Sequence, residues 1–259
     1  MLQAPDTAKL EGKARADAIT LVSANASGSA ANAPSAAIAM ARDGTVLFES
    51  AASDLVPLPP RGGMQVYAWR DGTVRLVSRA SDGGRANGTS RALAISANGR
   101  KVAFTSTAPD ALGLGTNPGG HAQLFVADLL DDNVVLVSHA LDAPTRGGNG
   151  PITQAMLSEG GAVVAFQGSP SDVSPRLAAG DNVFAWSGSP EPELVSINSA
   201  GFGGSSGSYL KGLSADGRFV LFETTGANMV QGVVDTNGRF DGFLRDRTTQ
   251  STKLVTHRS

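Results

Sequence analysis

Short apolar segments separated by small polar turns run along almost the whole chain. One of them, Leu-Val-Ser or Leu-Val-Thr, recurs five times, at 21–23, 76–78, 136–138, 194–196 and 254–256. The third residues of these copies are separated by 55, 60, 58 and 60 positions. A fixed period of this size is typical of a repeat architecture, in which each unit is one small supersecondary structure.

A tight turn keeps the same phase as this motif and is clearest in Leu213–Phe222. There Asp216-Gly217 separates two apolar segments, which predicts a hairpin because glycine accepts a positive φ. The corresponding pairs in the four units are Asp43-Gly44, Asn98-Gly99, Gly160-Gly161 and Asp216-Gly217. We expect each pair to form the corner between the first and second strands of its unit.

Two further strands complete each unit. An apolar-x-Phe strand follows the corner, then a strand carrying an aromatic residue, and the last strand ends in Leu-Val-Ser. The aromatic residues of the third strands are Tyr67, Phe125, Phe184 and Phe243. Four short strands in each unit, without a sustained helical period, predict an all-β protein. The predicted fold is a β-propeller of four-stranded antiparallel blades, with four repeats of about 55–60 residues.

The predicted domain covers 18–259, and its units span 24–78, 79–138, 139–196 and 197–256. Residues 1–17 are polar and lack an apolar stripe, so we interpret them as a leader or linker.

The repeat resembles the TolB-type, WD40-like propeller repeats of bacteria. The residues that carry the likeness are Leu-Val-Ser, a glycine-rich loop, Ser-x-Asp-Gly-Arg and apolar-x-Phe, best preserved in Leu194–Asp246 and in Ile95–Phe104. In the first and third units Arg42 and Glu159-Gly160-Gly161 depart from this pattern. The resemblance implies the fold and leaves the function open, because such propellers serve many unrelated purposes.

Composition narrows the class of partner. The net charge is −2, with 17% charged and 5% aromatic residues, so we expect no nucleic-acid partner. No apolar run approaches the ~20 residues that span a bilayer, and the absence of cysteine excludes disulfides and thiolate metal sites. No signal peptide is visible. We expect a bacterial periplasmic or secreted protein, with the cytoplasm left open.

Loops alternate between the two faces of a propeller, and here one face receives all the long ones. Each unit supplies one loop after Leu-Val-Ser and another between its second and third strands. These loops are 24–34, 79–90, 139–151 and 197–208, and 51–65, 107–123, 167–182 and 224–241. We expect a protein or glycan ligand on this long-loop face, with inert padding as an equal alternative.

The segment 235–241 is the sharpest candidate for a metal site. Asp235, Asn237 and Asp241 offer side-chain oxygens and Arg239 its carbonyl, a set of hard ligands that suits Ca²⁺. The alternative is an Asx-rich connection that its own side chains stabilise, and we favour it over the metal. The equivalent loops of the other units lack these acids.

No catalytic residue is predicted. Gly203–Gly207 fits Gly-x-Ser-x-Gly but lies in a loop between strands, without the helix that a nucleophile elbow needs. His121, His139 and His257 have no metal-ligand spacing, and we expect exposed loop histidines. Trp69 and Trp186 are expected to pack in the core or between blades, with sugar stacking as the minority interpretation.

These observations favour a non-catalytic binding or scaffold propeller. The alternatives are a polysaccharide lyase or hydrolase with a site at the ring centre, or a propeller domain excised from a multidomain protein. The fifth Leu-Val-Ser copy is one too many for four blades. Residues 18–23 are therefore a surplus outer strand, or they replace 253–256 in the last blade. We expect a monomer if the ring closes on itself, and otherwise a homodimer.

Overall fold

The computed structural model describes residues 19–111, 113–177, 180–232 and 238–256, and these contain strands and no helix. Sixteen of the strands form four four-stranded antiparallel sheets. The first sheet contains β1 (Ser35–Met40), β2 (Val46–Ser50), β3 (Gln65–Arg70) and β4 (Thr73–Leu76). The second contains β5 (Ser90–Ile95), β6 (Lys101–Ser106), β7 (Gln123–Asp128) and β8 (Asn133–Leu136).

The other two sheets repeat this order. The third contains β11 (Ile152–Leu157), β12 (Val164–Gly168), β13 (Asn182–Trp186) and β14 (Glu193–Leu194). The fourth contains β15 (Ser208–Leu213), β16 (Phe219–Thr224), β17 (Asp241–Asp246) and β18 (Ser251–Leu254). In every sheet the strands pair in chain order, which is the meander of a β-propeller blade. The predicted fold class is confirmed.

The core lies between consecutive sheets. Separate apolar clusters fill the interfaces between the first and second, second and third, and third and fourth sheets. In each sheet a stacked aromatic pair joins the second and third strands, with ring centroids 5.0–5.6 Å apart. The pairs are Phe48–Tyr67, Phe104–Phe125, Phe166–Phe184 and Phe222–Phe243. The last three pairs belong to clusters that include residues of the preceding sheet, and the recurring Phe is thus a packing residue.

The serine of Leu-Val-Ser has a structural role that explains its recurrence. The strands end at the leucine, and the serine that follows turns back toward the third strand. Buried Ser138 accepts a hydrogen bond from the Leu124 N–H at 2.8 Å and donates one to Gln123 Oε1 at 2.7 Å. Ser78 makes the same two bonds with Val66 and Gln65. The motif therefore locks the fourth strand to the start of the third.

The corner turns lie where they were predicted, between the first and second strands of each sheet. Only the second residue of each pair has a positive φ, 71–85° at Gly44, Gly99, Gly161 and Gly217. The turn with positive φ at both central residues is Asp71-Gly72, between β3 and β4, at 48° and 84°. That pattern matches a type I′ turn. Asp-Gly pairs therefore form corner turns in the first and fourth sheets and also the connection between β3 and β4.

Two predicted segments are placed differently. The loop at 139–151 contains a two-stranded hairpin, β9 (His139–Ala140) with β10 (Ala143–Gly147). Residues 19–23 form no strand and pair with neither the first nor the last sheet, while β18 keeps the outer position of the fourth sheet. Both expectations for this fifth copy, a surplus strand or a replacement for 253–256, are wrong.

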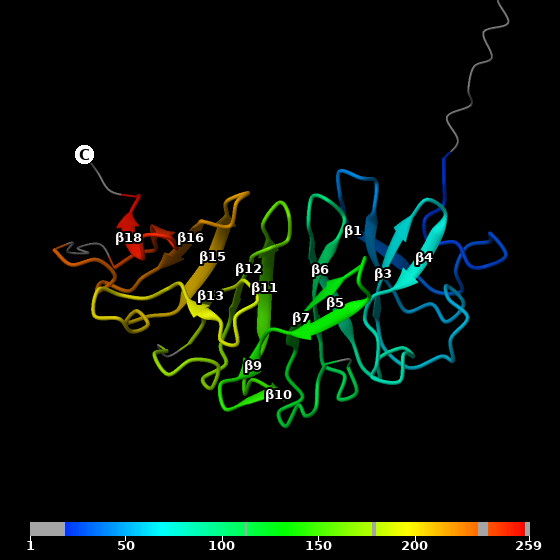
Figure 1. The fold of residues 1–259 in the computed structure, drawn as a ribbon, viewed down its shortest axis with the longest axis horizontal. Coiled ribbons are helices and arrows are strands. Elements are labelled where there is room, and N and C mark those ends of the chain that lie inside the picture. Colours follow the sequence, from blue (N-terminus) through cyan, green and yellow to red (C-terminus); the bar gives the residue numbers. More distant parts are fainter. Residues whose placement is uncertain (1–18, 112, 178–179, 233–237, 257–259) are drawn as a thin grey trace, which may run out of the picture.

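The four sheets follow one another along an open arc, with β1–β4 at one end and β18 at the other (Figure 1). Among the described residues no hydrogen bond, ion pair or apolar cluster joins the first sheet to the fourth. No helix in the described part of the chain is long and apolar enough to cross a membrane.

Candidate functional site

The long loops of each unit are fastened to each other by a side chain that sequence reasoning did not identify. In the second unit Asp110, from the loop between β6 and β7, accepts a hydrogen bond from the Asn87 N–H at 2.7 Å. The acceptors at this position are Asp54, Asp110, Asp172 and Asn228, and their backbone donors are Asn32, Asn87, Asn149 and Ser205. We call this contact the loop clamp.

The loop clamp has a sequence signal that could have revealed it. Its four acceptors occur at 54, 110, 172 and 228, at the same phase of each repeat unit. A short Asx side chain recurring in loops of otherwise unrelated sequence indicates a conserved backbone contact rather than padding. The contact crosses more than twenty residues in each unit, so it orders two loops at once.

Arginines strengthen the clamp in the second and third units. Arg61 forms ion pairs with Asp82 and, at 3.3 Å, with Asp110. The Arg61 guanidinium, with a hydrogen bond from the Gly84 N–H, holds the pKa of Asp82 below its usual range. Arg146 pairs in the same way with Asp142 and, at 2.8 Å, with Asp172. Each group is an exposed or half-exposed cluster on the long-loop face.

A buried arginine organises the long loop between β2 and β3. Arg85 is only 1% exposed, and its guanidinium donates to the backbone carbonyls of four residues. These are Ser53, Val56, Leu58 and Pro59, with distances of 2.5–3.2 Å. The side chain thus serves as an internal scaffold for 53–59, because carbonyl oxygens satisfy its donors in place of water.

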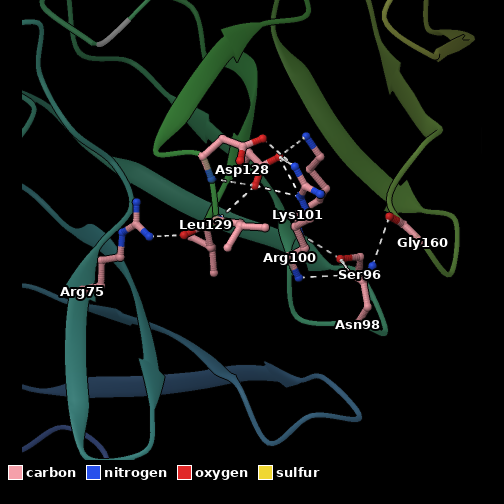
Figure 2. A network of polar contacts seen from close by, with 10 residues as sticks. Arg75, Ser96, Asn98, Arg100, Lys101, Asp128, Leu129 and Gly160 are labelled. Atoms are coloured by element: carbon pink, nitrogen blue, oxygen red, sulfur yellow. Dashed lines mark hydrogen bonds and ion pairs between the residues drawn. The ribbon is translucent and has the colours of Figure 1, made fainter.

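The opposite face carries a polar network around Asp128, at the end of β7 (Figure 2). Its buried carboxylate accepts hydrogen bonds from Arg100 at 2.9–3.0 Å and lies 2.7 Å from the Lys101 ammonium. Burial opposes ionisation, but these two cations and the N–H groups of Leu130 and Asp131 together hold the pKa of Asp128 well below its usual range. The carboxylate thus anchors the β7–β8 turn.

A pocket of about 390 Å³ lies beside this network, between the first and second sheets. Ala68, Leu129 and Leu130 contribute apolar surface to it, and three arginines line it. Each arginine already has a carboxylate partner, and the three pairs are Arg70 with Asp43, Arg75 with Asp132 and Arg100 with Asp128. The pocket therefore offers little uncompensated charge to an anion.

The predicted calcium residues are only partly within the described chain. Asp235 and Asn237 lie outside the described residues. Asp241 begins β17, and its Oδ1 accepts a hydrogen bond from the Thr256 hydroxyl at 3.0 Å. Arg239 lies in the connection before it. No group of three or more metal-ligating side chains occurs among the described residues. The calcium site therefore stays a prediction.

The other candidates have structural surroundings. The prediction for His139 was wrong, because it is buried in β9, with Nδ1 2.9 Å from the carbonyl of Ala140. Trp186 packs against the cluster between the second and third sheets, and Trp69 against an apolar cluster on the outer side of the first sheet. Gly203–Gly207 lies in a loop, without a following helix. His257 lies outside the described residues.

Comparison with models of known protein families finds no match, and comparison with curated proteins finds none either. Solved structures do match. The β-propeller domain of the Trilobed protease from Pyrococcus furiosus, described as having an open velcro topology, is 15% identical, with a TM-score of 0.45. The match covers 86% of this chain and 54% of that one.

A putative TolB from Agrobacterium tumefaciens is 13% identical over 83% of this chain and 62% of its own, with a TM-score of 0.44. The periplasmic gluconolactonase of Pseudomonas aeruginosa is 20% identical over 85% and 55%, with a TM-score of 0.34. The chain thus spans little more than half the length of these structures. The sheets define it as a β-propeller protein, and at these identities the likeness extends to the fold alone.

Proposed function

We propose that the chain is a non-catalytic binding or scaffold module that takes a protein or glycan ligand on its long-loop face. The observation that supports this most strongly is the loop clamp. It repeats in all four units and holds two long loops of each unit together. Ordering a loop costs conformational entropy. A contact that repeatedly orders eight loops therefore favours a binding role for the face that they form.

The chemistry of the face suits polar recognition. Its loops are rich in Gly, Ser and Asn, and its Arg61 and Arg146 clusters combine cationic and anionic groups. Such groups can donate to and accept from sugar hydroxyls or peptide groups. We propose a periplasmic or secreted location for the module, and fractionation of the source cells would test it.

Binding to a panel of soluble polysaccharides and periplasmic proteins tests the proposal. The Asp110→Ala variant removes one loop clamp, and a bound member of the panel should lose at least about tenfold in affinity. The matched control is the Asp71→Asn variant, since Asp71 is exposed in the β3–β4 turn of the opposite face. This variant should bind the ligand as tightly as the unaltered chain does. Equal loss in both variants, or a ligand that Asp110→Ala still binds unchanged, would contradict the assignment to this face.

A further inference from the structure

The innermost strand of the first sheet is exposed where its counterparts are buried. Register places Ala37 opposite Phe48, as Ala92 lies opposite Phe104 and Leu210 opposite Phe222. Ala92 and Leu210 are buried against the preceding sheet, whereas Ala37 is exposed. Met40, at the register position of the packed residues Ile95 and Leu213, is 72% exposed.

The corner glycine of the first sheet shows the same difference. A side chain in place of Gly99, Gly161 or Gly217 would collide with Asp43, Lys101 or Val163 of the preceding sheet. A side chain in place of Gly44 would meet open space. We call the exposed set Ser35, Ala37, Met40 and Gly44 the N-terminal end face. It has the form of the internal sheet surfaces, but no other sheet of the described residues packs on it.

The fourth sheet is unusually exposed on the face that points away from the third sheet. Val77, Val137 and Val195 of the Leu-Val-Ser motifs are at most 2% exposed, but Val255 is 47% exposed. Leu221 and Leu244 are half-buried, although the residues at their positions in the other three sheets are buried. We call Leu221, Glu223, Leu244 and Val255 the C-terminal end face. No other sheet of the described residues packs on it.

Backbone hydrogen bonds between the corner turns run in one direction along the arc. The Arg42 N–H donates to Ala97 O at 2.9 Å, the Ala97 N–H to Glu159 O at 3.0 Å and the Glu159 N–H to Ala215 O at 2.8 Å. These four residues hold the same position in successive corners. The series leaves the Ala215 N–H as a donor on the last corner and the Arg42 carbonyl as an acceptor on the first.

Two further contacts leave complementary groups at the ends. Glu49 Oε1 accepts from the Ala92 N–H and Gln167 Oε1 from the Leu210 N–H, at 2.8 and 2.9 Å, which ties the first sheet to the second and the third to the fourth. At their position the fourth sheet has Glu223, whose ion-pair partner among the described residues is Lys211 of its own sheet, at 3.0 Å. In the first sheet the Ala37 N–H, in register with Ala92 and Leu210, meets no preceding sheet.

The start of each inner strand repeats this arrangement. The Ser90 N–H donates to Met64 O and the Ser208 N–H donates to Asp181 O, both at 2.8 Å. Each acceptor residue lies just before the third strand of the preceding sheet. The corresponding groups at the two ends are the Ser35 N–H and the Phe240 carbonyl. Donor and acceptor are thus divided between the two end faces in each of the three contacts.

We propose that the two end faces dock on each other between copies of this chain, so that two chains form one ring of eight sheets. A second copy of the chain fits each end face, because the hydrogen-bond donors of one end face match the acceptors of the other. The internal interfaces pair the same groups at the same positions. A contact between different faces generates a closed ring or an open filament. Two four-sheet chains give eight sheets, within the propeller range of about four to eight, whereas three would give twelve.

Residues 19–23 must move for this contact to form. Leu21-Val22-Ser23 precedes β1 as Leu76-Val77-Ser78 precedes β5, so it stands where the partner's Leu254–Thr256 would lie. Ile19 and Leu21 are exposed and belong to no sheet, whereas Leu254 pairs with Phe243 in β18. The unpaired segment is therefore the one that gives way.

Light scattering and sedimentation of the full chain over a wide concentration range test the proposal. The unaltered chain should have twice the monomer mass. Met40→Arg on the N-terminal end face and Val255→Arg on the C-terminal end face should each give monomers, since an unpaired charge would then be buried in both contacts. Leu130→Arg is the matched control, because Leu130 is 73% exposed and lies on neither face. It should remain a dimer.

Mixing the two variants separates this contact from a symmetric one. A Met40→Arg chain keeps its C-terminal face and a Val255→Arg chain its N-terminal face, so the mixture regains one of the two contacts and forms a heterodimer. A contact between like faces would not be regained by mixing, and that result overturns the proposal. So does a chain that is monomeric at every concentration, or one that forms a series of larger oligomers.

The register of the contact can be read separately in this cysteine-free chain. Ala215→Cys and Arg42→Cys chains, mixed under oxidising conditions, should form a disulfide-linked pair, because adjacent corners are joined by a backbone hydrogen bond at this position. Pairing Ala215→Cys with Asp71→Cys should give none. Equal cross-linking in both mixtures would overturn the proposed register.

Discussion

The interface between the second and third sheets and the outer side of the fourth sheet are built from the same sequence motif, yet they differ in burial. Val137 and Val255 both follow the leucine of a Leu-Val-Ser or Leu-Val-Thr segment, but Val137 is fully buried and Val255 is half exposed. The motif fixes how the fourth strand joins the third, since that depends on local hydrogen bonds. Burial depends on whether another sheet follows, and no residue of the motif encodes that.

The largest effect is expected at the buried phenylalanine rings between adjacent sheets. Phe104→Ala and Phe222→Ala each remove a ring that is at most 1% exposed and packed between two sheets. Each should lower the free energy of unfolding by about 3–5 kcal/mol, because the lost burial is added to an unfilled cavity. Urea denaturation followed by circular dichroism would measure it.

The control for the aromatic substitutions is Phe202→Ala, since Phe202 is largely exposed in a loop. Its loss should stay below about 1 kcal/mol. Losses of that small size at Phe104 and Phe222 would show that the apolar-x-Phe strand does not form the core between sheets.

A matched pair of valines makes the comparison sharper. Val137→Ala should lower the free energy of unfolding by about 1–3 kcal/mol, because two methyl groups leave a closed apolar cluster. Val255→Ala should cost less than about 0.5 kcal/mol in the monomer. Denaturation is best measured on the Met40→Arg background, where association cannot add to the stability of Val255. Equal costs at both positions would contradict the difference in burial.

The repeat made most of the fold predictable. Leu-Val-Ser, the corner turn and the recurring Phe each specify a local strand or turn, and a constant spacing assembles them into sheets without long-range information. The failed prediction for residues 18–23 has the opposite cause. Leu21–Ser23 carries the full motif but has no third strand beside it, so the hydrogen bonds that make Ser138 a lock are missing.

The candidate site was less predictable because its contacts cross between loops. The clamp from Asp110 to Asn87 joins residues of different loops, and its one sequence signal is an Asx residue that recurs at the same phase of each unit. His139 was expected on the surface because its segment looked like a loop, but the β9–β10 hairpin buries it. Loop conformation is determined by such contacts, whereas strand positions follow from alternation and turn chemistry.

Two carboxylates occupy one position of the repeat, Asp128 in the second sheet and Asp246 in the fourth, and the effects expected there are smaller than those at the buried rings. Both accept two backbone N–H groups of the following turn, and the pKa of each is held well below its usual range. Asp128 is more deeply buried and bound by two cations, Arg100 and Lys101, whereas Asp246 pairs with one cation of the described residues, Arg218.

Asp128→Asn should therefore lower the free energy of unfolding at pH 7 by about 1–3 kcal/mol, because charged donors would lose a buried acceptor. The folded-state pKa of Asp128 lies below its unfolded value of about 3.9, so its stabilisation is complete above that value and is lost as the pH falls further. The difference in free energy of unfolding between the unaltered chain and Asp128→Asn should therefore narrow below about pH 4. Urea denaturation at a series of pH values would measure it. Asp246→Asn should show the same trend with a smaller gap at neutral pH, since solvent reaches Arg218 and weakens its ion pair. A gap at Asp128 that is independent of pH would mean that packing, and not the charge, makes this position matter.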